Sequence, residues 1–440
     1  MTYHPDLLAR PVPRYTSYPT AAEFTDHVGA EDQPRALGRV RGDEPLSLYL
    51  HVPFCEKICF YCGCNTGAAN RSARLERYVA ALHAEIELVA ARLGGRGRVI
   101  RVAFGGGSPN ALSPEQLEGL HSHILDALGG DHAAWSIEID PRSLDEAFLD
   151  AVARIGFERA SLGVQTFDPA IQEAIGRIQP LESIAAATQG LRKAGITSLN
   201  FDLMYGLPRQ DAANFGATLD VAVDMRPDRL AVFGYAHVPQ IIPRQRKIDD
   251  SALPGTEARF AMAQQAQRRL VDAGYATVGF DHFALPEDPL GRAAAAGRVR
   301  RNFQGYTDDP CNVSIGLGAS AISRLPGLLV QNDKNGGRYG LKVGNGLFAA
   351  ERGVLLTPLE RIRGHAIEKL LCNGACDIRP LHDRQRIKAA VQPFVERGLA
   401  SCKDGIIGID PDKGWPYARA IAALFDPWRQ DSKGRFSNAV

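Results

Sequence analysis

The sequence predicts an α/β barrel, and three observations support this fold class. β-rich apolar runs alternate with amphipathic helical stretches from about residue 46 to residue 285. Strand followed by helix recurs six times, which is typical of parallel strands joined by right-handed crossovers. Conspicuous polar and glycine-rich sequences follow the strands, where the chemistry of such barrels is located. We therefore expect a barrel or open barrel, with six units that make a partial (β/α)6 barrel.

The six expected strands are short apolar runs with many β-branched and aromatic residues. They are Leu46–Phe54, Val99–Phe104, Ser136–Ile139, Ala160–Val164, Leu199–Tyr205 and Leu230–Tyr235. A further run, Tyr275–Phe280, is a candidate to extend the sheet.

Between the strands, apolar residues recur with the spacing of a helix that buries one face. One such stripe consists of Leu75, Tyr78, Val79, Leu82, Ile86 and Val89, and a second of Leu117, Leu120, Ile124 and Leu128. The second helix has a proline-led start at Ser113 and Pro114.

The sequences after the expected strands place unusual residues at one rim of the barrel. They read HVPFC, GGGSPN, EIDPR, GVQ, DLMYGLP and GYAHVP in chain order. The carboxyl ends of parallel strands lie together, so these residues are expected to surround one site.

Three segments flank the barrel that we expect over residues 46–285. Residues 1–45 show no strong period and form an N-terminal arm with the dense sequence PRYTSYPT at Pro13–Thr20. Residues 286–350 are expected to extend the site, and residues 351–440 to form a small, mostly helical C-terminal domain. Leu359–Leu371 is one of the helical stretches of that domain.

The composition excludes several classes of function. The chain has 51 Lys and Arg against 50 Asp and Glu, a net charge of +1, so no global field favours nucleic acid or a membrane. We find no signal peptide in MTYHPDLLARPVPRY and no run of the ~18–20 apolar residues that a membrane span needs. We expect a cytoplasmic protein with reduced thiols.

Eight cysteines in a reducing compartment are better explained as ligands or buried residues than as disulfides. Four of them, Cys55, Cys59, Cys62 and Cys64, crowd into ten residues. The others are scattered, although Cys372 and Cys376 lie four apart on an expected helix and could share a face.

The strongest chemical signal is the spacing Cys55-x3-Cys59-x2-Cys62. Three thiolates at this spacing can bind three irons of a [4Fe–4S] cluster from one short loop. The fourth iron then has no protein ligand and is open to an external chelator, such as the amino and carboxylate groups of methionine. The alternative is a closed zinc site completed by Cys64, since zinc binds four thiolates tetrahedrally.

Other candidate residues stand at the same rim. The glycines of GGGSP, at Gly105–Pro109, let backbone groups approach a ligand closely, although a tight turn uses the same residues. Glu138 could hold ribose hydroxyls or pair with a barrel arginine. Gln165, Arg177 and Asp202 lie at or past later strands and are equally open to a binding or a structural role.

These motifs resemble the radical S-adenosylmethionine superfamily and, more narrowly, the oxygen-independent coproporphyrinogen III oxidases (dehydrogenases). The resemblance covers nearly the whole chain. It is carried by PRYTSYPT, YLHVPFCEKICFYCGCN, FGGGSP, EIDPR, SLGVQ, FDLMYGLP, YAHVP, QRKI, DHFA, RNFQGYT and GLGASAIS. The cysteine motif identifies only the superfamily, whereas PRYTSYPT, the extra Cys64 and RNFQGYT are more selective.

The resemblance implies a radical-SAM barrel in which Cys55, Cys59 and Cys62 hold one [4Fe–4S] cluster and Cys64 lies near it. It implies one S-adenosylmethionine on the open iron, in contact with Tyr49, Tyr61, Gly106, Glu138, Ala236 and Ile322. A second S-adenosylmethionine maps to Gly107, Ser108, Gln165, Arg177 and Asp202. The N-terminal arm would cover this site.

The implied reaction converts coproporphyrinogen III to protoporphyrinogen IX without oxygen. A 5′-deoxyadenosyl radical removes a hydrogen from the β-carbon of a propionate, and loss of CO2 and one electron leaves a vinyl group, twice in turn. The implied partners are a low-potential electron donor such as flavodoxin or ferredoxin and an unidentified electron acceptor, and the protein is expected to be a monomer. Cationic candidates for the substrate carboxylates are Arg14, Arg244, Arg246, Lys247 and Arg301.

Two alternatives share the cluster. Haem chaperones bind haem without decarboxylating it, but they generally lack PRYTSYPT and the cysteine at position 64. Another porphyrin-acting radical enzyme, such as an anaerobic haem-degrading methyltransferase, is the second. Two positions and one stretch depart from the family pattern. Ser108 replaces a commoner Thr, Gly234 stands where a larger polar residue is frequent, and Asp308–Ser314 is unlike the usual loop.

Overall fold

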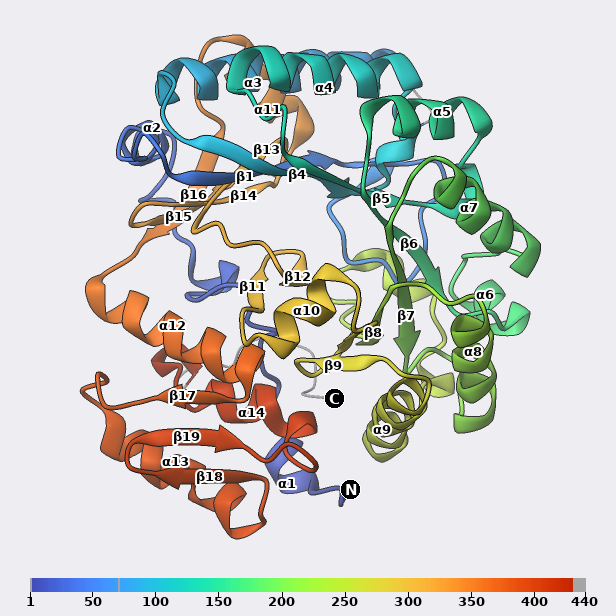
Figure 1. The fold of residues 1–440 in the computed structure, drawn as a ribbon, viewed down its shortest axis with the longest axis vertical. Coiled ribbons are helices and arrows are strands. Elements are labelled where there is room, and N and C mark those ends of the chain that lie inside the picture. The colour runs from blue at the N-terminus through green and yellow to red at the C-terminus, as the bar shows by residue number, and fades with distance from the viewer. Residues whose placement is uncertain (1, 70–71, 430–440) are drawn as a thin grey trace.

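The computed structural model describes residues 2–69 and 72–429, and its main feature is a curved sheet with helices along its outer face (Figure 1). Six neighbouring strands of this sheet are parallel and follow chain order. They are β1 (Pro45–Val52), β4 (Arg98–Gly106), β5 (Ala134–Ile139), β6 (Arg159–Gln165), β7 (Ser198–Tyr205) and β8 (Arg229–Gly234). These are the six predicted strands, each displaced by two residues or fewer at either end.

A helix follows each of these strands and packs on the outside of the sheet. The helices are α3 (Ser72–Leu93), α4 (Pro114–Leu128), α5 (Glu146–Ile155), α6 (Pro169–Ala174), α7 (Leu181–Lys193), α8 (Ala212–Asp224) and α9 (Thr256–Asp272). Ser113 caps α4 through a hydrogen bond with the backbone of Gln116, as the proline-led start suggested. The partial (β/α)6 barrel predicted from the sequence is confirmed.

Additional strands continue the sheet at both edges, to a total of 12. On one side β13 (Val313–Leu317) runs parallel to β1, and β14 (Ile322–Leu325), β15 (Leu328–Asn332) and β16 (Ala350–Leu355) follow in antiparallel order. On the other side β10 (His282–Ala284) and β9 (Ala276–Val278) pair antiparallel beyond β8. β9 lies in the run Tyr275–Phe280 that was a candidate to extend the sheet. β16 and β9 are the two ends of the strand order, so the barrel is open among the described residues.

The largest hydrophobic core lies between the parallel strands and the outer helices. Leu82, Ile86 and Ile124 are fully buried there, and every residue of the predicted Leu75–Val89 stripe is buried. Inside the curve of the sheet lie α10 (Pro289–Ala295) and the hairpin of β11 (Arg300–Asn302) and β12 (Gly305–Thr307) (Figure 1). The outer helices therefore cover the outer face of the sheet, whereas α10 and the β11–β12 hairpin lie on its inner side.

The C-terminal region combines helices with a small sheet. Its helices are α12 (Pro358–Asn373), α13 (Arg384–Glu396) and α14 (Ala418–Ala423), and its antiparallel sheet has the order β17 (Ala375–Asp377), β19 (Ile406–Ile409) and β18 (Ala400–Lys403). The helical region is confirmed, but the sheet was not foreseen. The expectation that Cys372 and Cys376 share a helix face was wrong, because Gly374 ends α12 with a positive φ of 73° and Cys376 lies on β17.

The N-terminal arm, with α1 (Pro5–Leu8) and α2 (Asp32–Leu37), packs partly on this C-terminal region. Leu8, Val12, Tyr15 and Tyr18 belong to its hydrophobic core. The predicted boundaries at residues 45, 285 and 350 stay predictions, although β13–β16 continue the main sheet.

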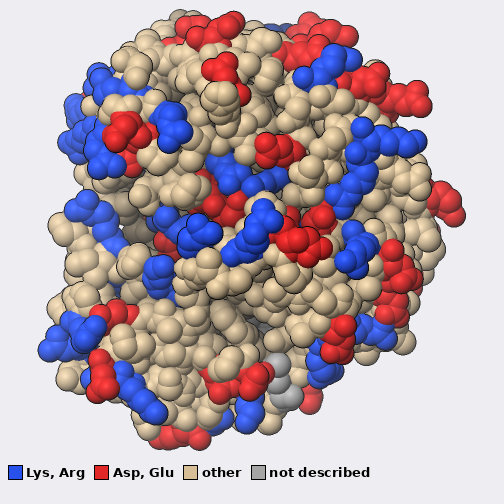
Figure 2. All heavy atoms as spheres, viewed as in Figure 1, with Lys and Arg blue, Asp and Glu red and all other residues tan. Residues whose placement is uncertain are grey.

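The surface carries both signs of charge. Figure 2 shows acidic and basic side chains interspersed over one face, in keeping with the net charge of +1. None of the helices within residues 2–69 and 72–429 has the length and apolar character needed to traverse a bilayer.

One buried carboxylate joins three elements of the fold. Glu85 of α3 accepts hydrogen bonds from the backbone N–H of Gly318 (2.6 Å), the amide of Asn332 (2.7 Å) and the hydroxyl of Tyr339 (2.7 Å). Tyr339 lies on α11 (Gly336–Gly344), and Gly318 directly follows β13. Glu85 therefore fixes α3 against the β13–β14 loop and α11.

We predict that Glu85→Ala lowers the free energy of unfolding by about 2–4 kcal/mol, because three buried donors lose their acceptor. Denaturant unfolding followed by circular dichroism measures the change. Glu76→Ala, at an exposed position of the same helix, is the matched control and should change stability little. Equal stability of the two variants would contradict the role assigned to Glu85.

Candidate functional site

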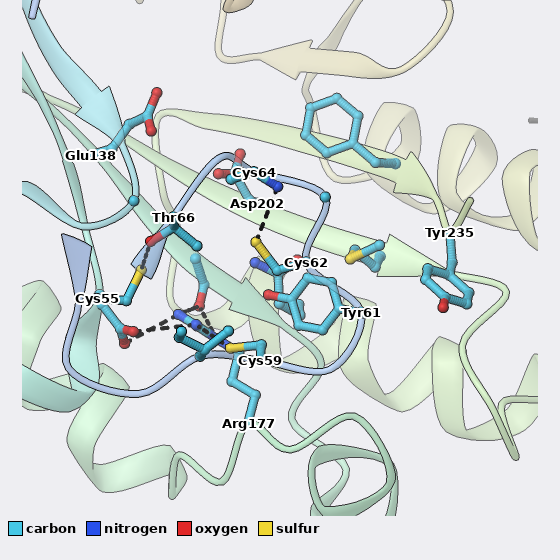
Figure 3. Close-up of a pocket in the computed structure, with 18 of the residues that line it drawn as sticks. Cys55, Cys59, Tyr61, Cys62, Cys64, Thr66, Glu138, Arg177, Asp202 and Tyr235 are labelled. Carbon is cyan, nitrogen blue, oxygen red and sulfur yellow. Dashed lines mark hydrogen bonds and ion pairs between the residues drawn. The ribbon is translucent and has the colours of Figure 1, made fainter. Parts of the chain in front are cut away.

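A cavity of about 410 Å3 lies at the carboxyl ends of the six parallel strands (Figure 3). Each of these strands, or the loop after it, contributes to its wall. Of the fourteen site residues named from the sequence, eleven line this cavity: Cys55, Cys59, Tyr61, Cys62, Gly106, Gly107, Glu138, Gln165, Arg177, Asp202 and Ala236. The expectation that residues after separate strands meet at one rim is thus met.

The cysteine loop is fastened to the barrel at several points. At its ends, β2 (Phe54–Cys55) pairs in parallel with β3 (Gly67–Ala68). At its tip, the N–H of Phe60 donates to the carbonyl of Ile175 (3.0 Å). The amide of Gln245 donates to the carbonyls of Tyr61 (2.9 Å) and Ala236 (3.0 Å). These contacts hold the three cysteines at the cavity wall.

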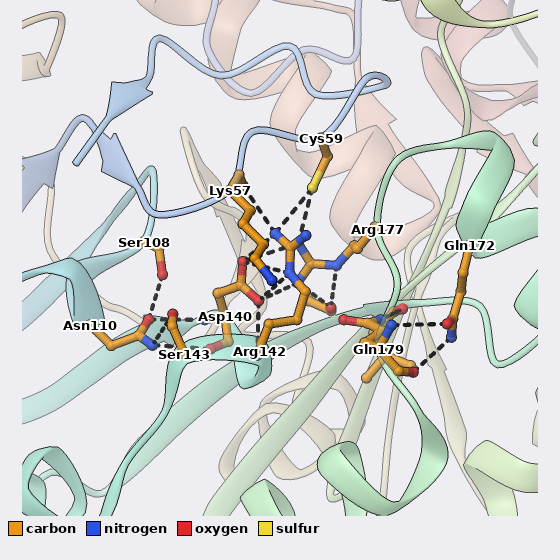
Figure 4. Close-up of polar contacts among 12 residues, drawn as sticks. Lys57, Cys59, Ser108, Asn110, Asp140, Arg142, Ser143, Gln172, Arg177 and Gln179 are labelled. Carbon is orange, nitrogen blue, oxygen red and sulfur yellow. Dashed lines mark hydrogen bonds and ion pairs between the residues drawn. The ribbon is translucent and has the colours of Figure 1, made fainter. Parts of the chain in front are cut away.

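Two buried arginines lie against the middle cysteine (Figure 4). Nη2 of Arg142 and Nη1 of Arg177 each lie 3.3 Å from Sγ of Cys59. Both guanidinium groups also pair with Asp140, at 2.6 Å from Arg142 and 3.2 Å from Arg177. Burial opposes the charge of Arg177, but Tyr61, Asp140 and Cys59 together raise its pKa well above the ordinary value. Cys59 therefore lies in direct contact with two cationic side chains.

The other two thiols of the motif have different polar partners. Sγ of Cys55 lies 3.1 Å from Oγ1 of Thr66, and the N–H of Cys64 donates to Sγ of Cys62 (3.4 Å). Hydrogen bonding to Cys64 lowers the pKa of Cys62 to about 6, whereas burial raises that of Cys55 to about 11.

The donor set fits an iron–sulfur cluster. Figure 3 shows the sulfurs of Cys55, Cys59 and Cys62 around one common space. Within the described ranges, no three His, Cys, Asp or Glu side chains converge closely enough to bind a single metal ion. A four-iron cluster has a separate iron for each thiolate, so its ligands need not converge on one point. The cationic surroundings of Cys59 suit the negative charge of such a cluster.

The glycine-rich segment packs tightly against the cysteine loop. The N–H of Ser108 donates to the carbonyl of Phe54 (2.7 Å), and a Cβ on Gly107 would lie 2.5 Å from that same oxygen. A Cβ on Gly106, whose φ is +110°, would lie 2.4 Å from the ring of His51. These positions require glycine, and their backbone lines the cavity as a result.

Two partly buried carboxylates face the cavity from β5 and β7. Glu138 accepts a hydrogen bond from the N–H of Gly106 (3.0 Å) rather than pairing with a barrel arginine, and burial raises its pKa to about 7. Asp202 accepts hydrogen bonds from Ser161 (3.1 Å) and Asn200 (2.8 Å), and burial raises its pKa. Both can accept hydrogen bonds from a bound polar ligand.

Comparison with known proteins agrees with this geometry. The model of the Radical SAM superfamily matches residues 49–222. Coproporphyrinogen III oxidase, anaerobic 1, of Cereibacter sphaeroides is 39% identical over 438 residues, which cover 97% of this chain and 96% of that protein. The oxygen-independent coproporphyrinogen III oxidase of Bradyrhizobium diazoefficiens is 40% identical over 437 residues, with 98% and 97% coverage. The chain belongs to the oxygen-independent coproporphyrinogen III oxidases.

A solved structure of this family shows the same fold. Coproporphyrinogen III oxidase (HemN) from Escherichia coli, described as a radical SAM enzyme, superposes with a TM-score of 0.89 at 35% sequence identity. The match covers 95% of this chain and 100% of that one. Membership of this radical SAM family implies a [4Fe–4S] cluster and S-adenosylmethionine, which the cysteine loop and cavity can accommodate.

Three site residues that the family resemblance suggested do not line the cavity. Tyr49 lies on β1 with its hydroxyl 3.2 Å from Nδ1 of His51, and Ser108 is buried with its hydroxyl donating to Asn110. Ile322 begins β14 and pairs with Gln331 of β15. Their assignment as contacts of S-adenosylmethionine stays a prediction.

Several residues of the site were not predicted from the sequence. Asp140 and Arg142 stand in the quoted EIDPR motif but were not singled out, and their contact with Cys59 appears only in the fold. Thr66 gave no signal beyond its nearness to the cysteines. Arg14, Phe233 and Met204 also line the cavity. Of these, only Arg14 was named, among five cationic candidates.

We predict that Cys59→Ser abolishes the broad visible absorbance of the anaerobically reconstituted iron–sulfur protein, because one iron loses its thiolate. Cys64→Ser is the matched control and should keep that absorbance, because the assignment of three cysteine ligands does not include Cys64. Iron and sulfide analysis of both variants complements the spectra. Undiminished absorbance in Cys59→Ser, or its loss in Cys64→Ser, would contradict the ligand assignment.

Proposed function

We propose that this protein catalyses the oxygen-independent oxidative decarboxylation of two propionate side chains of coproporphyrinogen III, which gives protoporphyrinogen IX. One observation carries this proposal beyond family membership. The cavity that holds the three thiols of the cysteine motif is also lined by Arg14 of the N-terminal arm, so a carboxylate partner and a radical source can share one space.

The reaction requires more than acid–base chemistry, because the β-carbon of a propionate has no acidic hydrogen. Cys55, Cys59 and Cys62 would hold the cluster, with S-adenosylmethionine on its open iron. Bound there, these groups would supply the radical chemistry that the β-carbon requires. Tyr61, Gly106, Glu138 and Ala236 line the cavity and are well placed to orient the nucleoside and methionine parts.

A second S-adenosylmethionine is part of the proposal. Of the residues assigned to it, Gly107, Gln165, Arg177 and Asp202 line the same cavity, whereas Ser108 does not. Arg177 bridges Cys59, Asp140 and the carbonyl of Gly163, so its position is fixed before any ligand arrives.

The structure distinguishes the five cationic candidates for the substrate carboxylates. Arg14 lines the cavity, donates to the carbonyl of Gly234 (2.8 Å) and lies over the ring of Phe233. Arg244 donates to the carbonyl of Thr66, and Lys247 lies over the ring of Phe60. Arg246 is exposed and does not line the cavity. Arg14 is therefore the candidate that we assign to a propionate.

The fifth candidate, Arg301, holds the arm instead. Its guanidinium donates to the carbonyls of Arg14 (3.0 Å) and Tyr15 (3.2 Å). Arg419 of α14 donates to the carbonyl of Val12 (2.7 Å), and the hydroxyl of Tyr15 donates to Asp426 (3.0 Å). The arm is thus tied to the inner hairpin and to the C-terminal region. Arg14 is presented from a fixed backbone, which limits the entropy lost on substrate binding.

The remaining partners belong to the same proposal. We expect a low-potential electron donor such as flavodoxin or ferredoxin, an electron acceptor of unidentified nature, and a monomeric enzyme. We assign it to the cytoplasm, where its eight free cysteines would stay reduced.

We predict that the reconstituted holoenzyme, supplied with S-adenosylmethionine and a reductant under anaerobic conditions, converts coproporphyrinogen III to a product lighter by two CO2 and four hydrogens. Mass spectrometry of the tetrapyrrole, together with assay of methionine and 5′-deoxyadenosine, measures this. Ring opening, methyl transfer or tight retention of unmodified haem without vinyl formation would overturn the proposed activity.

We predict that Arg14→Gln raises KM for coproporphyrinogen about 10- to 100-fold, because a charge-assisted hydrogen bond to a carboxylate is lost. Cleavage of S-adenosylmethionine without substrate should be unaffected. Arg246→Gln is the matched control and should keep the KM of the unaltered enzyme. The role of Arg14 is refuted if both variants have the same KM.

A further inference from the structure

A second large cavity lies behind the cysteine loop, on the outer side of the barrel. Its volume is about 650 Å3, and its walls come from the first half of α3, from α11 and from the end of the cysteine loop. It is a different space from the cavity of the proposed active site, and Thr66 lines both. Thr66, whose hydroxyl contacts the thiol of Cys55, is therefore common to the walls of both spaces.

Contacts across this thin wall are short. Oγ1 of Thr66 lies 3.1 Å from Sγ of Cys55, and Phe54, the residue before Cys55, lines the outer groove. The guanidinium of Arg74 lies over the ring of Phe54, 5.5 Å from its centre. Asn65, next to Thr66, donates to the carbonyl of Lys334 (3.0 Å). The groove is thus built directly onto the loop that would hold the cluster.

The charge of the groove is of one sign. Arg74, Arg77 and Lys334 line it and are all exposed, and the residues of the described chain that line it include neither Asp nor Glu. This contrasts with the net charge of +1 and with the mixed charges over the face in Figure 2. Leu341 of α11, 69% exposed, adds an apolar contact point.

We infer that this groove is the docking site of a small acidic protein that delivers single electrons. The inference rests on the proposed function, because reductive cleavage of S-adenosylmethionine consumes one electron for each radical. The donor loses one electron and the cluster gains it, and no atom is transferred. Substrate and S-adenosylmethionine would occupy the active-site cavity, whereas the outer groove is a separate space.

The physical requirements of such an encounter match the groove. Electron transfer slows steeply with distance, so a donor must approach where the wall over the thiols is thinnest. Complexes between redox proteins are small and short-lived, and complementary charge brings the partners together. The groove presents three cationic side chains and the exposed Leu341. These would complement a donor protein that has acidic side chains around an exposed prosthetic group.

The test reverses charge at the groove without touching the cysteine loop. In the holoenzyme, the double variant Arg77→Glu and Lys334→Glu should weaken binding of oxidised flavodoxin, measured by surface plasmon resonance, about tenfold or more at low salt. Reduction by flavodoxin hydroquinone, followed by the bleaching of the cluster in stopped flow, should slow by a similar factor. Reduction by dithionite should keep its rate.

The matched control reverses two exposed charges elsewhere, Arg361→Glu and Lys413→Glu of the C-terminal region. Equal flavodoxin binding by the groove variant and the unaltered protein, or an equal loss in the control, would overturn the inference. If the groove variant lost heparin binding as much as flavodoxin binding, the groove would be a non-specific anion surface, and the inference would also fail. It would fail as well if the unaltered protein did not bind flavodoxin. Failure of the proposed function is seen separately, as absence of vinyl product when dithionite supplies the electrons.

Discussion

The site depends on the contact between one cysteine and two buried arginines. Cys59 lies at the centre of the loop, and it contacts Arg142 from the segment after β5 and Arg177 from the segment after α6. Buried guanidinium groups are costly without a partner, and Asp140 between them supplies it. Because both arginines are fixed by the same carboxylate, the cysteine loop can adopt only a narrow range of positions over the barrel. The direction of the three thiols, and hence the space in front of them, follows from this arrangement.

The two sides of the cysteine loop differ in character. On the inner side, the arm, the inner hairpin and the C-terminal region converge on Arg14, and the partly buried carboxylates of Glu138 and Asp202 face the cavity. On the outer side, the groove between α3 and α11 is open and cationic. A radical enzyme benefits from this separation, since its substrate side has to exclude water while its electron supply has to be reachable.

Much of this organisation could be predicted from the sequence, because its signals are local. Each of the six parallel strands is a contiguous apolar run, and the three cysteines lie within one loop, so neither needed tertiary information. The small sheet of the C-terminal region was missed, because its strands of three or four residues carry no periodicity. Gly374 was the local signal that the helix ends before Cys376, and its positive φ is typical of that position.

The partners of the site were harder to predict, because they depend on contacts between distant residues. Arg14 and Arg301 were both candidate cations in the sequence. Only the structure shows that Arg14 lines the cavity and that Arg301 donates hydrogen bonds to the backbone of the N-terminal arm. Arg301 and Arg14 are 287 positions apart in sequence. Tyr49, Ser108 and Ile322 came from family resemblance, and their side chains do not line the cavity that the other eleven share.

The most direct test of this account is the coordination of the open iron. Electron–nuclear double resonance of the reduced, reconstituted protein, with S-adenosylmethionine labelled with 15N in its amino group and 17O in its carboxylate, reports on atoms bound to that iron. Hyperfine coupling from both labels would show that three cysteines leave one iron free for the cofactor. A cluster without such coupling, or one whose fourth iron is ligated by protein, would contradict the account.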